Sequence, residues 1–118
     1  MGFLAGPDCE KISFYRNLLA HNWRRNPRVL AEEVEVVNNY IYNYDSGALI
    51  LKSTHREKDT TSSHFINNYF DAPRDNMSKN RPIQKADAGK IYIKGNLSKQ
   101  LRPDYSIDEM KMAHGELE

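Results

Sequence analysis

The sequence has one cysteine and no long apolar run. Because Cys9 has no second cysteine to pair with, no disulfide within the chain can hold a fold together. The longest purely apolar run, residues 48–51, is far shorter than the roughly 20 residues of a transmembrane helix. The first residues also lack the basic segment and the apolar stretch of a secretory signal. We therefore expect a protein that acts in the cytoplasm, or is delivered into the cytosol of another cell, and has no membrane partner.

Large apolar side chains are scarce. Ile, Leu, Val and Phe together account for 25 of the 118 residues, just above the level of about 20% below which strongly charged chains stay unfolded. The net charge is only +1, and seven Tyr add area that can be buried. We therefore expect one small soluble domain over residues 1–118, with residues 1–7 and 113–118 flexible.

The near-neutral total hides four charge blocks. Residues 1–30, 31–73, 74–102 and 103–118 carry net charges of +3, −4, +6 and −4. Blocks of this kind either pair with one another within the fold or present separate faces to partners.

Two helices are predicted in the N-terminal part. Asp8 is a good N-cap, and the apolar residues that follow recur at three- and four-residue steps, which predicts a helix over 9–23. Asn26 followed by a proline is typical of a second helix start, so we predict a shorter helix from residue 27 to about residue 34 or 37.

The clearest pattern predicts a β-hairpin over 36–55. Residues 36–44 are rich in β-branched and aromatic side chains, and residues 48–54 form a second strand-like run. Between them lies Asp45-Ser46-Gly47, which is typical of a three-residue hairpin loop with glycine at its left-handed position.

The rest of the chain completes an α+β prediction. We expect a short helix over 64–70, a long polar loop over 71–89, a strand over 90–94 and a short C-terminal helix that begins near Ser106. The expected fold is two N-terminal helices packed on a small antiparallel sheet, made of hairpin 36–55 and strand 90–94. We recognise no internal repeat.

Signatures of common enzymes are missing from the sequence. It contains no glycine-rich phosphate loop, no Gly-x-Ser-x-Gly elbow and no His-Glu-x-x-His pair. His55 and His64 flank a polar segment that could fold back and bring them together as an acid–base pair. We therefore keep a metal-independent ribonuclease as the alternative function, and we expect no cofactor and no metal ion.

Two groups of residues favour binding instead. Tyrosines alternate along 40–44, where they either cover the sheet as core or form a contact surface, and a basic run follows Trp23. The predicted contact residues are Trp23, Arg24, Arg25, Arg28, Tyr40, Tyr42, Tyr44 and Tyr92. Since Trp, Tyr and Arg dominate interface hot spots, we expect a non-enzymatic module that binds a protein partner, with nucleic-acid binding as the alternative. The sequence does not indicate an oligomeric state.

Overall fold

The computed structural model describes residues 2–45, 47–51, 62–72, 82–86 and 90–98, and all structural statements below concern these residues. They form twelve strands and no helix. The strands are β1 (Leu4–Ala5), β2 (Ile12–Tyr15), β3 (Leu18–Ala20), β4 (Arg28–Val29), β5 (Glu33–Val37), β6 (Tyr40–Tyr42), β7 (Ala48–Leu51), β8 (Ser62–Ile66), β9 (Tyr69–Asp71), β10 (Ile83–Ala86), β11 (Lys90–Lys94) and β12 (Leu97–Ser98).

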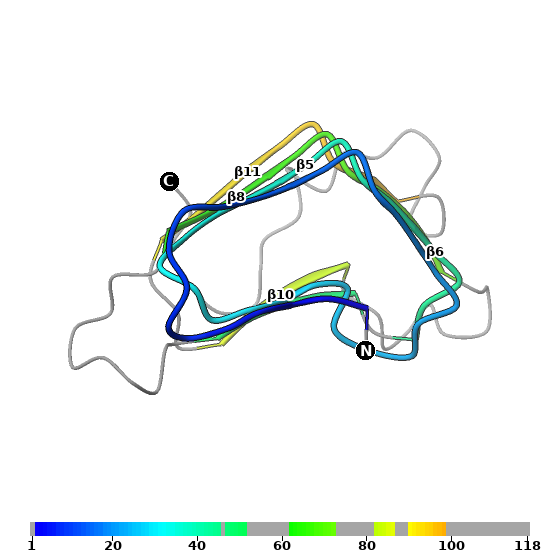
Figure 1. The fold of residues 1–118 in the computed structure, drawn as a ribbon. Coiled ribbons are helices and arrows are strands. Elements are labelled where there is room, and N and C mark those ends of the chain that lie inside the picture. The colour runs from blue at the N-terminus through cyan, green and yellow to red at the C-terminus, as the bar shows by residue number, and fades with distance from the viewer. Residues whose placement is uncertain (1, 46, 52–61, 73–81, 87–89, 99–118) are drawn as a thin grey trace.

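The strands form three parallel sheets that wind as a β-helix. Sheet A has the order β1-β4-β7-β10, sheet B has β11-β8-β5-β2 and sheet C has β12-β9-β6-β3. Three consecutive strands, one in each sheet, make one coil, so coil 1 is β1–β3, coil 2 is β4–β6, coil 3 is β7–β9 and coil 4 is β10–β12. Viewed along the axis, the four coils lie almost on top of one another, with the sheets as the sides of a flattened triangle (Figure 1).

The corner between sheets B and C is built in the same way in every coil. Two residues separate the strands, and the first has a left-handed backbone: Arg16 (φ 54), Asn38 (φ 56), Asn67 (φ 54) and Gly95 (φ 67). Asn and Gly adopt this conformation at the least cost. The second residue of each corner is an asparagine.

These four asparagines, Asn17, Asn39, Asn68 and Asn96, form a hydrogen-bonded ladder along the axis. The backbone N–H and side-chain Nδ2 of Asn39 both donate to Oδ1 of Asn68 at 3.0 Å. Asn68 donates in the same way to Asn96, at 2.9 and 2.8 Å. Nδ2 of Asn68 also donates to the Val36 carbonyl of the preceding coil, at 2.7 Å. The ladder therefore has a direction: Oδ1 of Asn39, Asn68 and Asn96 each accepts from the coil before it.

Alternate side chains along each strand point inward and fill the interior. In β5 the side chains of Glu33 and Glu35 face solvent, whereas Val34 and Val36 are buried, as expected for a strand with one covered face. Inward residues at the same height stack from coil to coil. One such row in sheet B is Phe14, Val36, Phe65 and Ile93, and the row in sheet C is Leu19, Ile41, Phe70 and Ser98.

The predicted α+β fold is wrong. The region predicted as helix 9–23 contains β2 and β3, that predicted as helix 27–37 contains β4 and β5, and that predicted as helix 64–70 contains β8 and β9. Residues that recur at helical steps in 9–23 do not share a buried face, because Tyr15 is 50% exposed and Trp23 is 66% exposed. Parallel pairing to the next coil satisfies the backbone groups that a helix would have satisfied internally.

The antiparallel hairpin is wrong as well. β6 belongs to sheet C and β7 to sheet A, and each strand pairs with parallel neighbours from other coils. Gly47 lies at the corner where β7 begins, and a β-carbon there would overlap the Pro82 carbonyl. Glycine is therefore required by close approach to the next coil rather than by a hairpin turn.

Other predictions have separate outcomes. The strand at 90–94 is confirmed as β11, which pairs with β8 in parallel. Within the predicted loop 71–89, residues 83–86 form β10. His55, the C-terminal helix and residues 113–118 lie outside the described residues. No described segment is a helix that could cross a membrane.

Replacement of a central ladder residue should be costly. Asn68→Ala removes the acceptor of two Asn39 N–H groups and the donor to Val36, all of them buried. Since each buried polar group left unpaired costs about 1–3 kcal/mol, we expect urea denaturation to show a loss of about 3 kcal/mol or more in the free energy of unfolding. Asn17→Ala, at the half-exposed end of the ladder, is the matched control and should cost about 1 kcal/mol. Equal losses in the free energy of unfolding for the two variants would contradict the expectation that the buried hydrogen bonds of the ladder stabilise the fold more than those at its half-exposed end.

Removal of the buried Ser63 hydroxyl should stabilise the fold, in contrast to the loss of a ladder asparagine. The inward side chain of Ser63 is 0% exposed between Val34 and Ile91, and its Oγ has no hydrogen-bond partner. Ser63→Ala removes the unpaired group and should raise the free energy of unfolding by about 1 kcal/mol. The control is Ser62→Ala, which changes a half-buried neighbour and should have little effect. Destabilisation by Ser63→Ala in urea unfolding would show that the hydroxyl is paired.

Candidate functional site

Apolar and phenolic side chains form a stripe on the outer face of sheet C. The residue that follows each ladder asparagine points outward, so one such residue from each coil lies beside the next. These residues are Leu18, Tyr40, Tyr69 and Leu97. Leu18 is 64% exposed, and Tyr40 and Leu97 are each 40% exposed. Tyr42, two residues along β6, is also 40% exposed and widens the stripe. We call these five residues the tyrosine stripe.

Ring contacts and one hydrogen bond hold the stripe together. The Tyr40 ring lies 5.3 Å from that of Tyr69 and 6.1 Å from that of Tyr42, tilted by 49° and 47°. The Tyr40 hydroxyl donates to Oδ2 of Asp71 at 3.1 Å. Desolvation, followed by the neighbouring Asp71 carboxylate, raises the pKa of Tyr40. The phenol therefore stays neutral and fixed, and the stripe presents an ordered surface.

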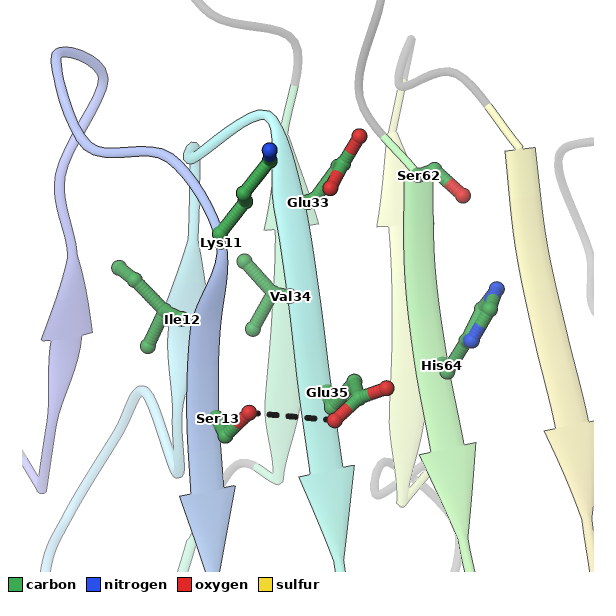
Figure 2. A pocket seen from close by; sticks show the side chains of 8 residues that line it. All are labelled: Lys11, Ile12, Ser13, Glu33, Val34, Glu35, Ser62 and His64. Atoms are coloured by element: carbon green, nitrogen blue, oxygen red, sulfur yellow. Dashed lines mark hydrogen bonds between the residues drawn. The ribbon is translucent and has the colours of Figure 1, made fainter.

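A second feature lies on the outer face of sheet B. A hollow of about 460 Å³ is lined by Lys11, Ile12, Ser13, Glu33, Val34, Glu35, Ser62 and His64. Figure 2 shows the side chains of Ser13, Glu35 and His64 projecting from three neighbouring strands on the same face. The Ser13 hydroxyl donates to Oε2 of Glu35 at 3.1 Å. The next residue in this row, Tyr92, meets the His64 ring edge-on at 5.7 Å.

The order of these groups argues against nucleophilic catalysis. In a Ser–His–acid triad the imidazole lies between the hydroxyl and the carboxylate, so that it can take the hydroxyl proton. Here the carboxylate of Glu35 lies between Ser13 and His64 and accepts the hydrogen bond from Ser13. Among the described residues, no group of three or more His, Cys, Asp or Glu could hold a metal ion. The lining of the hollow combines charged and polar side chains with the apolar residues Ile12 and Val34.

The predicted contact residues fall in several places. Tyr40 and Tyr42 lie together on sheet C, and Tyr92 lies on sheet B beside His64. Tyr44 is buried at 2% exposure, with its ring against Phe70. Trp23 and the three arginines lie outside the strands of sheet C: Trp23 and Arg24 are exposed after β3, Arg25 is half-buried, and Arg28 is half-buried in β4 of sheet A. His55, the proposed catalytic partner of His64, lies outside the described residues.

Three residues of the stripe were missed from the sequence. Leu18, Tyr69 and Leu97 occupy the same position in their coils as Tyr40, directly after an asparagine. A search for Asn followed by Leu or Tyr, with alternating apolar residues before it, finds all four. Comparisons with protein-family models, with curated proteins and with solved structures found no significant match for this chain.

The burial of Tyr44 predicts a loss of stability at high pH. Desolvation and the nearby Asp71 raise the pKa of Tyr44, whereas an unfolded tyrosine ionises near pH 10. The folded state therefore keeps a proton that the unfolded state releases, and the free energy of unfolding falls as the pH rises above about 10. Between pH 9 and pH 11, the free energy of unfolding measured in urea should fall less for Tyr44→Phe than for the wild type. Tyr42→Phe, which changes an exposed ring, is the control and should behave as wild type.

Proposed function

We propose that this protein is a non-enzymatic module that binds a protein partner through the tyrosine stripe on sheet C. The observation that carries the proposal is the exposure of Leu18, Tyr40 and Leu97 along one line of a sheet face. Contiguous exposed apolar side chains of this kind are typical of interaction sites.

The composition of the stripe favours a protein over a sugar chain. Sugars stack on aromatic rings, but the two ends of the stripe, Leu18 and Leu97, are aliphatic. Aliphatic ends and a phenolic centre match the mixed apolar surface of a protein, because tyrosine supplies both area and a polar tip. The ring contacts and the Tyr40–Asp71 hydrogen bond reduce the ordering cost of binding.

The stripe residues can be replaced without disturbing the core, which makes the proposal testable. Each stripe residue lies outside the core, so its replacement leaves the inward rows Phe14–Ile93 and Leu19–Ser98 in place. A stripe variant can therefore lose binding and still fold.

Site-specific photo-crosslinking in living cells tests this proposal. A benzophenone amino acid placed at position 18 should give a discrete protein adduct in cells that produce the chain, and Tyr40→Ala should abolish that adduct. The same group at position 15, which is exposed on sheet B, is the control and should give no such adduct. With the partner identified from the adduct, Tyr40→Ala should weaken its binding at least tenfold.

Two results would overturn the proposal. One is a set of adducts that is the same from positions 15 and 18, since this would show non-specific contact. The other is binding of the purified chain to immobilised polysaccharides or to labelled RNA, in a manner lost on Tyr40→Ala, while no protein adduct forms.

A further inference from the structure

We infer that the outer face of sheet B binds a neutral polysaccharide that lies along the axis of the β-helix, across the strands. The inference is independent of the tyrosine stripe, which lies on sheet C. It rests on the hollow over β2, β5 and β8, on the groups that line this hollow, and on the spacing of the outward rows beside it.

The hollow has the volume and the position of a ligand site. Its volume of about 460 Å³ lies within the range of about 300–1,000 Å³ that is usual for small-molecule sites. Its lining residues come from β2, β5 and β8, with Lys11 directly before β2, so the hollow extends over three consecutive coils. A ligand that fills it therefore lies across the strands rather than along one of them.

Hydrogen-bond donors and acceptors line the hollow together (Figure 2). Glu33 and Glu35 supply carboxylate oxygens as acceptors. Lys11 supplies an ammonium group and Ser62 a hydroxyl. The side chains of Lys11, Glu33 and Ser62 make no hydrogen bond or ion pair with another residue that the structure describes. A sugar hydroxyl can donate to a carboxylate and accept from an ammonium group, so this lining suits a ligand that carries several hydroxyls.

The charges of this face favour a neutral ligand. Glu33 and Glu35 project from the same side of β5, and Lys11 precedes β2 in line with Glu33. Further along the row that contains Glu33, β11 begins with the exposed Lys90. An acidic polymer would meet two carboxylates, and a basic polymer would meet a lysine at each end of the row. A polymer of uncharged sugars avoids both repulsions.

The outward rows repeat at the spacing of the coils. One row on this face consists of Ser13, Glu35, His64 and Tyr92. Neighbouring strands of a sheet lie about 4.8 Å apart, which is close to the length of one pyranose unit in an extended chain. A polysaccharide along the row therefore places one sugar unit over each coil. An extended peptide advances by about 3.3 Å per residue, so its side chains would fall out of step with the coils.

Apolar side chains lie beside the polar ones. The second outward row on sheet B consists of Tyr15, Val37, Ile66 and Lys94. Tyr15 is 50% exposed, and Val37 and Ile66 are half-buried. The half-buried ring of Tyr92 meets the His64 ring edge-on. A pyranose ring has apolar C–H faces and a rim of hydroxyls. Its C–H face can therefore rest on these apolar groups while its hydroxyls reach the hollow.

Biolayer interferometry with the full chain tests this inference. The sensors carry one of four neutral polysaccharides, which are hydroxyethyl cellulose, galactomannan, arabinoxylan and dextran, or the acidic polymer polygalacturonate. We expect saturable binding to at least one neutral polymer and weaker binding to polygalacturonate. The inference is overturned if none of the four neutral polymers binds, or if polygalacturonate binds as tightly as the best of them.

Three variants locate the site. Tyr92→Ala removes a ring and should weaken binding to the best polymer at least tenfold. Glu33→Gln changes an exposed side chain, which leaves the core intact, and should weaken binding about threefold or more because it removes a charged acceptor. Trp23→Ala, which removes an exposed ring outside sheet B, is the matched control and should bind as the wild type does.

Two further results would contradict the assignment. One is polysaccharide binding that Trp23→Ala abolishes, or that both Tyr92→Ala and Glu33→Gln leave unchanged, since the sugar would then lie elsewhere on the chain. The other is a discrete protein adduct in living cells from a benzophenone amino acid at position 13, at the edge of the hollow, because the occupant of sheet B would then be a protein.

Discussion

The buried asparagine ladder is the constraint on which the rest of the structure depends. An amide in the interior is tolerated only when its donors and acceptor are paired, and Asn39 and Asn68 achieve this only with coils on both sides of them. A shift of one residue between coils would separate every donor from its acceptor. It would also turn the inward side chains outward. The ladder therefore sets one register for sheets B and C together.

That register also determines the outer surface. Each ladder asparagine is followed by a residue that begins a strand of sheet C and points outward, which places Leu18, Tyr40, Tyr69 and Leu97 in line. The same alternation places Ser13, Glu35, His64 and Tyr92 in line on sheet B. The sheet C row is apolar and phenolic, and this sheet B row is polar with mixed charge, although a single corner orients both. Sheet B also carries a second outward row, made of Tyr15, Val37, Ile66 and Lys94. The proposed partner surface is thus a direct consequence of the core.

The sequence supports some local predictions but not the fold. Strand 90–94 was predicted because its alternation is regular and glycines bound it. In 9–23, Ile12, Tyr15 and Leu19 also match helical spacing, and no local rule separates a short strand pair with a two-residue corner from a helix. Long-range pairing decides the outcome.

The repeat was missed because its asparagines are spaced by 22, 29 and 28 residues, so the unequal spacing conceals it. Within the candidate site, Tyr40 and Tyr42 were predicted, whereas the leucines were not, since only the register makes them neighbours.

The unequal loop lengths have a consequence for how such a chain can change. Between coils 1 and 2 the corner asparagines are 22 residues apart, and between coils 2 and 3 they are 29 apart, yet the ladder bonds are of similar length. Additional residues are therefore accommodated between strands without strain on the rungs. In repeat architectures, stability is close to a sum of unit terms and nearest-neighbour terms. Duplication of a whole coil by recombination would thus preserve the fold. The number of coils is therefore a property on which selection can act.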